Sequence, residues 1–188
     1  MALTRIGHVA PLSIVASNRQ TLRRRVSFAV VLLLVHGFAA PVYAAGPQEA
    51  QPLPDVTFRT YQNESVRTGD MKGSVIFVEL WATNCKACPP MRAAAERLNG
   101  QFAAQGVMFL SINEDANQKA WEESLIHQPS PLIEVRDEKH SFRRMMHVTS
   151  LPAACIVDRS GHVRWRGPWT SASEAETSAA VARLLQEH

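Results

Sequence analysis

The fold is decided by Ser74-Val75-Ile76-Phe77-Val78-Glu79-Leu80-Trp81-Ala82-Thr83-Asn84-Cys85-Lys86-Ala87-Cys88. Residues 74–80 form a nearly continuous β-branched and aromatic run, which is typical of a central parallel strand buried on both faces. The chain then passes through a short loop, residues 81–84, to two cysteines separated by two residues. Beyond them, apolar residues at helical spacing predict a helix that begins at or just after Cys85 and contains Met91, Ala95, Leu98 and Phe102.

The rest of the chain alternates between strand-like and helix-like segments. Strands are predicted over residues 56–61, 107–112, 132–135, 153–158 and 163–165, and helices over residues 118–127 and 139–146. A capping box at Ser173-Glu174-Ala175-Glu176 predicts the start of a last helix. From Ser74 onward the order is β-α-β-α-β-α-β-β-α, which indicates an α/β fold with a mixed central sheet flanked by helices.

The spacing of Cys85 and Cys88 has two common interpretations, a redox couple or half of a zinc site. A structural zinc site needs a second pair of ligands. The remaining cysteine, Cys155, stands alone, and the histidines after residue 120 form no His-x(3–5)-His pair. We therefore favour the redox couple and predict no metal site. Cys155 falls in an apolar strand and is expected to be an inert buried thiol.

The position of the pair between a strand and a helix gives each cysteine a role. A thiolate at Cys85 faces the helix N-terminus, where unpaired amides and the helix dipole favour negative charge. Such sites lower a thiol pKa from about 8.5 to between roughly 3.5 and 7.5. Cys85 is therefore predicted to attack, and Cys88, one turn later, to resolve the mixed disulfide.

Three residues beside the pair modify this prediction. Lys86 either adds positive charge beside the nucleophile or is an ordinary solvated lysine. Pro89 and Pro90 lack amide donors and predict an irregular start of the helix.

Two segments resemble the thioredoxin superfamily and, within it, the exported TlpA/ResA-like thiol:disulfide oxidoreductases. Residues 78–88 carry an aromatic-Ala-x-x-Cys-x-x-Cys pattern, and residues 148–161 are similar to the cis-proline loop and β-hairpin of that family. The resemblance implies a thioredoxin-like fold with an extra helix–strand element at residues 114–136. It also implies a cis Pro152, no cofactor other than the Cys85–Cys88 disulfide, and a substrate site lined by Trp81, Lys86, Leu151 and Pro152.

Glu79 lies six residues before Cys85, where the resemblance implies a buried acid. A buried carboxyl has a raised pKa and can accept the proton of Cys88 as that thiol attacks the mixed disulfide. The alternative is a glutamate turned to solvent at the end of the strand. Phe77 and Leu80 around it favour burial, so Glu79 is predicted to be the third catalytic residue.

The N-terminal segment has the layout of a targeting signal. Residues 1–44 hold five arginines and no acidic residue, and Arg23, Arg24 and Arg25 precede an apolar run that ends in small residues. This pattern predicts a signal peptide cleaved after Ala44, or else an uncleaved membrane anchor. Residues 45–54 are then a flexible lead-in, and residues 55–188 form the thioredoxin-like domain.

Charge and resemblance together define the expected partners. Without the five N-terminal arginines, 15 basic side chains face 17 acidic ones, so no nucleic-acid binding is expected. The resemblance implies a monomeric, periplasmic or otherwise extracytoplasmic reductase. It would take electrons from a membrane thiol donor and reduce disulfides of exported proteins in cytochrome c or metal-site biogenesis. The alternatives are a disulfide-forming oxidase, and a module that holds copper for assembly.

Overall fold

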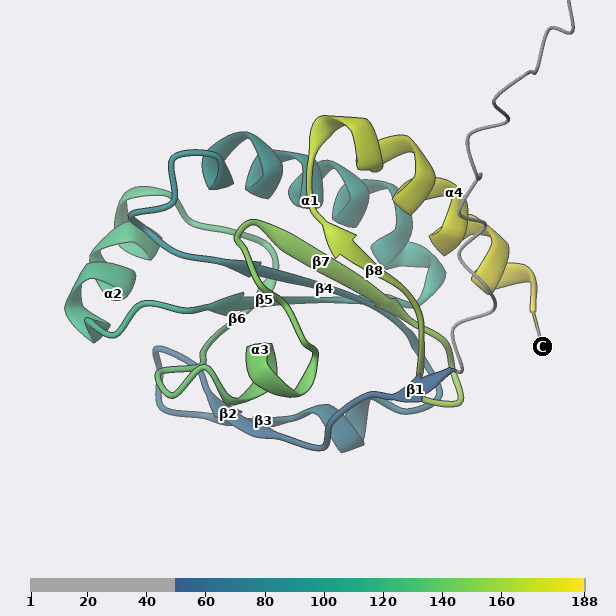
Figure 1. Cartoon of the computed structure of the whole chain (residues 1–188), viewed down its shortest axis with the longest axis horizontal. Coiled ribbons are helices and arrows are strands. Elements are labelled where there is room, and N and C mark those ends of the chain that lie inside the picture. The colour runs from purple at the N-terminus through teal and green to yellow at the C-terminus, as the bar shows by residue number, and fades with distance from the viewer. Residues whose placement is uncertain (1–49, 188) are drawn as a thin grey trace, which may run out of the picture. The chain divides into compact units, whose positions relative to one another are not determined.

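The computed structural model of the protein describes residues 50–187, which form one mixed sheet with helices packed against it (Figure 1). The elements are β1 (Gln51–Pro52), β2 (Thr57–Arg59), β3 (Ser65–Arg67), the 3-10 turn η1 (Thr68–Met71), β4 (Val75–Trp81), α1 (Cys88–Phe102), the 3-10 turn η2 (Ala103–Gln105), β5 (Val107–Asn113), α2 (Gln118–His127), β6 (Ile133–Arg136), α3 (Ser141–Met145), β7 (Ala153–Val157), β8 (His162–Pro168) and α4 (Ser171–Gln186).

The sheet has the strand order β1-β8-β7-β4-β5-β6-β2-β3. β4 and β5 are parallel, as are β5 and β6, whereas β7 pairs antiparallel with both β4 and β8. All seven residues of β4 are buried, as expected for a strand enclosed on both faces. The predicted mixed sheet and its thioredoxin-like order of elements are confirmed.

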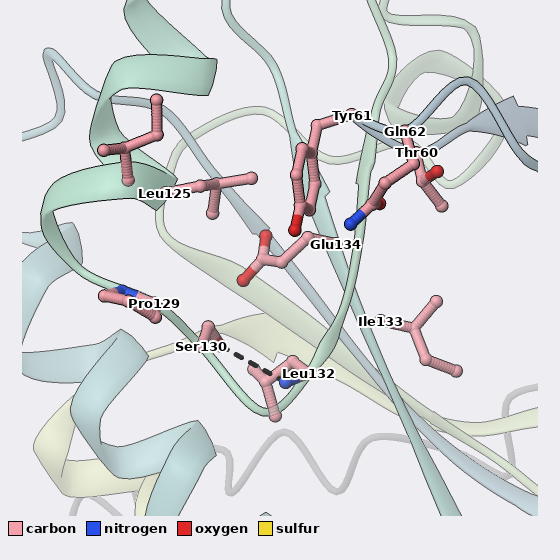
Figure 2. A pocket seen from close by; sticks show the side chains of 10 residues that line it. Thr60, Tyr61, Gln62, Leu125, Pro129, Ser130, Leu132, Ile133 and Glu134 are labelled. Carbon is pink, nitrogen blue, oxygen red and sulfur yellow. Dashed lines mark hydrogen bonds between the residues drawn. The ribbon is translucent and has the colours of Figure 1, made fainter.

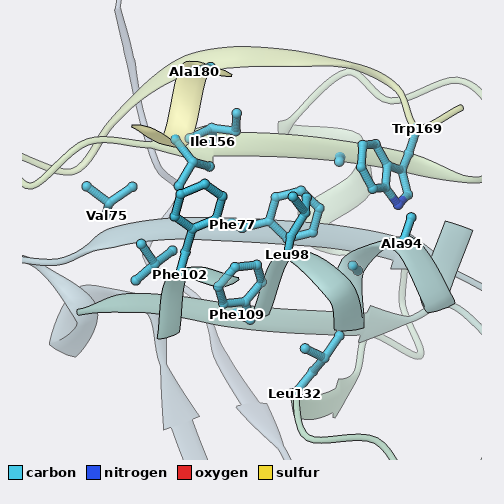
Figure 3. Close-up of a cluster of buried hydrophobic side chains, with 14 of the residues drawn as sticks. Val75, Phe77, Ala94, Leu98, Phe102, Phe109, Leu132, Ile156, Trp169 and Ala180 are labelled. Carbon is cyan, nitrogen blue, oxygen red and sulfur yellow. The ribbon is translucent and has the colours of Figure 1, made fainter. Parts of the chain in front are cut away.

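Alternation along β4 divides its side chains between two hydrophobic cores. Phe77 faces the layer formed by α1 and α4, where its ring lies 5.4 Å from the rings of both Phe109 and Trp169 (Figure 3). Val78 faces the opposite layer and packs in the cluster that contains Phe142 of α3. Because side chains alternate along a strand, Glu79 shares the α1 side of the sheet with Phe77.

Several predicted boundaries differ from the structure, and three of them concern helix starts or the lead-in. The last helix begins at Ser171 rather than within residues 173–176, since Thr170 is its N-cap and Ser173 is the reciprocal partner of the capping box. Helix α1 begins at Cys88, whereas its start was expected at or just after Cys85. Gln51–Pro52, in the predicted flexible lead-in, pairs as β1 with β8.

The predicted signal segment, residues 1–44, lies outside the described residues. Among residues 50–187, no helix combines the length and the apolar character that a membrane crossing requires.

Candidate active site

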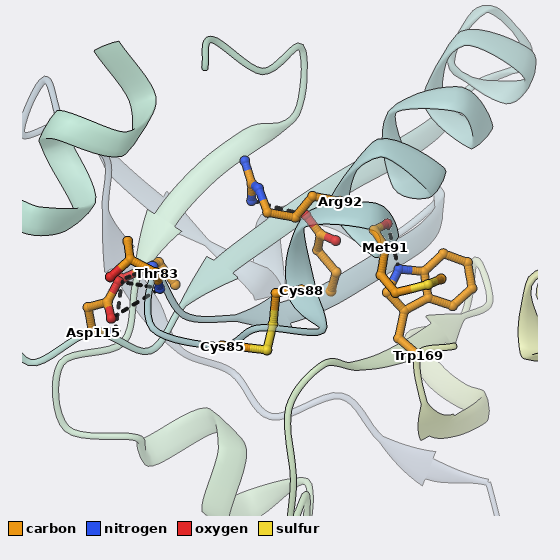
Figure 4. Close-up of a disulfide and its surroundings, with 9 residues drawn as sticks. Thr83, Cys85, Cys88, Met91, Arg92, Asp115 and Trp169 are labelled. Atoms are coloured by element: carbon orange, nitrogen blue, oxygen red, sulfur yellow. Dashed lines mark hydrogen bonds and ion pairs between the residues drawn. A yellow bond between two sulfur atoms is a disulfide. The ribbon is translucent and has the colours of Figure 1, made fainter. Parts of the chain in front are cut away.

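Cys85 and Cys88 form a disulfide at the N-terminus of α1, with their Cα atoms 5.4 Å apart (Figure 4). The Cys85 amide donates to the Ala82 carbonyl (3.1 Å), and the Cys88 amide donates to the Cys85 carbonyl (3.1 Å). These bonds wind the chain into a turn before the helix. The turn leaves Cys85 partly exposed and Cys88 completely buried. Only one of the two sulfurs is therefore open to a protein partner.

The two prolines after Cys88 fit the first turn of α1 without distorting it. Helix α1 starts at Cys88, so Pro89 and Pro90 occupy its second and third positions, where an amide has no acceptor within the helix. The predicted irregular start is wrong for this reason. The prolines nevertheless remove two donors from the helix N-terminus, which leaves the helix dipole as its main support for a Cys85 thiolate.

A buried carboxylate fixes the loop in front of Cys85. Both oxygens of Asp115 accept a hydrogen bond from the Thr83 amide (3.2 and 3.0 Å), and Asp115 Oδ2 also accepts one from Asn113 Nδ2 (2.8 Å). Asn113 Oδ1 in turn accepts from the Asp115 amide (2.9 Å). The end of β5 thus holds the loop that presents the first cysteine.

The cis-proline loop lies against the disulfide, as the resemblance implies. The Leu151–Pro152 bond is cis, and Leu151 packs against the cluster that contains Cys88 and Trp81. The Pro152 carbonyl accepts from the Trp169 amide (3.0 Å), and Trp169 Nε1 donates to the carbonyl of Met91 on α1 (2.9 Å). Trp169 therefore ties this loop to the helix that carries Cys88.

Glu79 lies in a buried network of charged and polar groups. Its Oε1 accepts from Arg92 Nη1 (3.2 Å) and from Ser111 Oγ (2.9 Å). Arg92 Nη1 also donates to Ser111 Oγ (2.9 Å), and Arg92 Nη2 donates to Glu134 Oε1 (2.7 Å). Glu79 is only 1% exposed, so the predicted burial of this residue is confirmed.

Burial governs the proton affinity of Glu79. It raises the pKa of this carboxyl to about 8, although the nearby Arg92 cation opposes the shift and the Glu134 carboxylate adds to it. Burial therefore favours the neutral acid at pH 7.

A cavity of about 260 Å³ borders the buried cysteine. Cys88, Arg92 and Trp81 form one side of it, while Ser124 and His127 of α2 contribute to the other. The Arg92 guanidinium lies 3.7 Å from the centroid of the Trp81 ring, a cation–π contact that holds both side chains in place. The extra helix–strand element thus encloses the site by means of α2.

A second buried carboxyl, Glu114, follows β5 at the same end of the sheet. Its amide donates to the Trp81 carbonyl (2.8 Å), and its Oε2 lies 2.6 Å from Nδ1 of His140. Burial raises the pKa of Glu114, and the hydrogen bond to His140 opposes that shift. Arg143, whose charge also opposes it, donates to the carbonyls of Val148 and Thr149 next to the cis-proline loop (3.1 and 2.8 Å).

The other predicted residues occupy simpler surroundings. Lys86 is exposed in the turn beside Cys85. Cys155 is buried in β7, and burial raises the pKa of its thiol to about 12, so it stays protonated at neutral pH. Among residues 50–187, no three His, Cys, Asp or Glu side chains are grouped to hold a metal ion.

The sequence prediction missed the residues that hold Glu79 and the loop before Cys85, among them Arg92, Asp115 and Glu134. The sequence spacing did indicate Arg92, because this residue lies four positions after Cys88 and so shares its face of the predicted helix. Glu134 stands between Ile133 and Val135 in a short strand, and only its contact with Arg92 explains its burial.

Comparisons with known proteins agree with this geometry. Residues 50–166 match the family model described as the AhpC/TSA family. The thioredoxin-like protein YneN of Bacillus subtilis (strain 168) is 27% identical over 123 residues, which cover 63% of this chain and 71% of YneN. The thiol-disulfide oxidoreductase ResA of Geobacillus kaustophilus (strain HTA426) is 23% identical over 111 residues, which cover 59% of this chain and 64% of ResA.

Solved structures share the fold. A protein described as a candidate thiol:disulfide interchange protein DsbE, from Chlorobium tepidum, superposes with a TM-score of 0.69 at 21% identity. The match covers 73% of this chain and 98% of that one. A thiol:disulfide interchange protein from a Bacteroides species gives a TM-score of 0.62 at 17% identity, over 71% of this chain and 90% of the other. The thioredoxin-like fold and the TlpA/ResA-like resemblance are therefore confirmed.

Proposed function

The chain belongs to the AhpC/TSA family, and on that premise we propose that it is an exported thiol:disulfide oxidoreductase that reduces disulfides of extracytoplasmic proteins. The observation that carries the proposal is the contrast between the partly exposed Cys85 and the fully buried Cys88, beside the cis-proline loop. An accessible sulfur next to an enclosed one assigns attack and resolution to different residues.

The reaction starts from the reduced pair. The Cys85 thiolate attacks one sulfur of the substrate disulfide, so that a Cys85–substrate bond forms, and the other substrate sulfur leaves as a thiolate that takes a proton from water. Cys88 then loses its proton and attacks the Cys85 sulfur. The Cys85–Cys88 bond forms and the second substrate thiolate leaves. Two electrons pass to the substrate, and the pair is oxidised.

Glu79 is the proposed acceptor of the Cys88 proton. Its pKa of about 8 makes the ionised form of Glu79 a stronger base than an ordinary carboxylate, which suits a group that accepts a proton from a thiol. Arg92 contacts Glu79 and also borders the cavity beside Cys88, so it connects this acid with the surroundings of the resolving cysteine.

The substrate is proposed to bind across Trp81, Lys86, Leu151 and Pro152. Leu151 supports this because it packs against the disulfide cluster while remaining partly exposed. Lys86 is exposed beside the attacking sulfur and can contact an incoming chain without rearrangement.

Export and electron supply complete the proposal. The arginine-rich and apolar pattern of residues 1–44 supports export by a signal. Outside the cytoplasm the oxidised pair needs a source of electrons, so we propose a membrane thiol donor that restores the dithiol. Exported proteins of cytochrome c or metal-site biogenesis are the proposed substrates, and the enzyme acts as a monomer.

Capture of partners in the native host tests the substrate class. In Cys88→Ala the mixed disulfide on Cys85 cannot be resolved, so substrates remain attached and are identified by mass spectrometry. We expect exported proteins with cysteine pairs. The matched control, Cys85→Ala, lacks the attacking sulfur and should capture none of them. Equal capture by both variants would contradict the assigned roles.

The reduction potential tests the direction of electron flow. A reductase should equilibrate well below the potential of a strong oxidase such as DsbA, about −120 mV. Equilibration with defined ratios of reduced and oxidised dithiothreitol or glutathione, followed by alkylation and mass measurement, gives the value. A potential near −120 mV would favour disulfide formation instead.

A further inference from the structure

A buried arginine joins the elements that surround the redox pair. Arg92 lies one turn after Cys88 on α1 and donates to Glu79, Ser111 and Glu134 on three neighbouring strands. We propose that Arg92, held in place by Glu134, is a positioning residue that sets the proton affinity of Glu79 for its exchange with Cys88. This inference rests on the proposed function and extends it to the extra helix–strand element, which supplies Glu134.

Glu134 has no evident structural advantage at its position. Its Oε1 binds Arg92, whereas its Oε2 is buried without a hydrogen-bond partner in the part of the chain that the structure describes. Figure 2 shows Glu134 beside Tyr61 and Leu125 in the wall of a second cavity, of about 490 Å³. A buried ion pair is often no more stable than apolar residues of similar volume. A role in the adjacent site accounts for the acid.

The charged groups around Glu79 are few and come from identifiable elements. Helix α1 contributes the Arg92 cation and, further away, the Glu96 carboxylate, and β6 contributes Glu134. Ser111 of β5 contributes a hydroxyl, and Ala154 of β7 lies opposite Glu79 in the sheet register. Arg92 is thus the cation that offsets the burial of this acid.

Arg92 links the cavity beside Cys88 to Glu79. Cys88 and Arg92 both border it, and Arg92 Nη1 binds Glu79. During resolution the Cys88 S–H bond breaks and the proton ends on a Glu79 oxygen, while the Cys88 sulfur bonds to Cys85. The guanidinium remains protonated throughout, so it orients the carboxylate and stabilises its charge without exchanging a proton.

Arg92 and Glu134 should therefore act in opposite directions. Without the Arg92 cation, the Glu79 carboxylate loses its main stabilising charge, and its pKa rises above the present value of about 8. Without the Glu134 carboxylate, Arg92 acts on Glu79 alone, and the pKa of Glu79 falls. A residue needed only for folding would not produce shifts of opposite sign.

The experiment follows the titration of Glu79 and the rate of resolution in the same set of proteins. Carboxyl carbon NMR of glutamate-labelled oxidised protein reports the titration and needs no turnover. Stopped-flow mixing of reduced protein with dithionitrobenzoate reports resolution as the release of the second thionitrobenzoate. Release is measured across a range of pH. We expect the midpoint of the Glu79 titration and the midpoint of the pH profile of release both to rise by about one pH unit or more in Arg92→Gln, with release at pH 7 slowed roughly tenfold. Both should fall in Glu134→Gln.

Three further variants make the result specific. Arg97→Gln removes a surface arginine of the same helix, paired with Glu174 at 2.9 Å, and should change neither midpoint. Arg92→Lys keeps the charge but loses the forked geometry, so its two midpoints should lie between those of the wild type and Arg92→Gln. If Arg92→Gln folds poorly, the shift in Arg92→Lys relative to the wild type serves in its place. In a Glu79→Gln background, Glu134→Gln should give no further shift in the release profile.

The outcomes separate the two proposals. Shifts of the same sign in Arg92→Gln and Glu134→Gln would overturn the positioning role. So would a release profile that stays fixed while the Glu79 titration moves. Failure of the wild-type protein to release any thionitrobenzoate would overturn the proposed function itself.

Discussion

Two buried glutamates at the same end of the sheet differ in the partner that each one meets. Glu79 on β4 binds Arg92, a cation at every accessible pH, whereas Glu114 after β5 binds the imidazole of His140. Burial raises the pKa of both acids. The permanent cation gives Glu79 a fixed electrostatic environment, which suits a group that exchanges a proton with a thiol.

The position of each partner separates the two sites further. Arg92 follows Cys88 on α1 and borders the cavity of the buried cysteine. His140 immediately precedes α3, and Arg143 of that helix holds the carbonyls next to the cis-proline loop. We therefore associate Glu79 with redox chemistry and Glu114 with the shape of the substrate loop.

Loss of the fixed cation should have the largest effect. Arg92→Met leaves Glu134 buried without its donor, and we expect the free energy of unfolding at pH 7 to fall by about 3–5 kcal/mol. Urea denaturation measures this loss. The matched control is Arg97→Met, which breaks a surface pair with Glu174 and should cost less than about 1 kcal/mol. Equal losses of unfolding free energy in Arg92→Met and Arg97→Met would contradict the distinction between the buried and the surface arginine.

Substitution of Glu79 should change how stability depends on pH. Its pKa is about 8 in the folded protein and about 4.3 in an unfolded chain, so the folded state binds more protons between these values. The free energy of unfolding of the wild type should therefore decrease, through this group, by about 3–4 kcal/mol from pH 5 to pH 8. Glu79→Gln should lack that decrease. Urea titrations at several pH values measure this difference. If the free energy of unfolding depended on pH in the same way in the wild type and in Glu79→Gln, Glu79 would not be held as the neutral acid.

Loss of the imidazole partner of Glu114 should lower the free energy of unfolding by less, and this loss should change with pH in the opposite direction. His140→Ala removes the hydrogen-bond donor of Glu114, and the expected loss at pH 7 is about 1–3 kcal/mol. Because the ionised Glu114 needs this donor most, the loss should grow as pH rises, whereas Glu79→Gln gains stability relative to wild type. Thermal denaturation at pH 5 and pH 8 checks this trend. A loss that shrinks at higher pH would contradict the assigned role of His140.

Local patterns in the sequence predicted the redox pair and its strand. The run of residues 74–80 has a composition typical of a fully buried strand, and the cysteine spacing is compatible with few kinds of site. Burial of Glu79 followed from its apolar neighbours in that strand. The cis Pro152 came from the resemblance, since residue types alone do not distinguish a cis from a trans proline.

The partners of Glu79 could not be read from local patterns. Arg92 and Glu134 lie 13 and 55 positions further along the chain, and only the packing of α1 on the sheet and the strand order β4-β5-β6 bring them to Glu79. The start of α1 was also misplaced, because the hydrogen bond from the Cys88 amide to the Cys85 carbonyl belongs to a turn that precedes the helix.

The division of roles between the cysteines is the central claim, and trapping with a defined disulfide tests it most directly. Reduced Cys88→Ala and Cys85→Ala are each mixed with a cystine-containing peptide, and the products are weighed by mass spectrometry. We predict that Cys88→Ala accumulates a peptide adduct on Cys85, whereas Cys85→Ala, whose remaining site cysteine is fully buried, stays unmodified there. An adduct on Cys88 that forms as fast as the one on Cys85 would contradict the account.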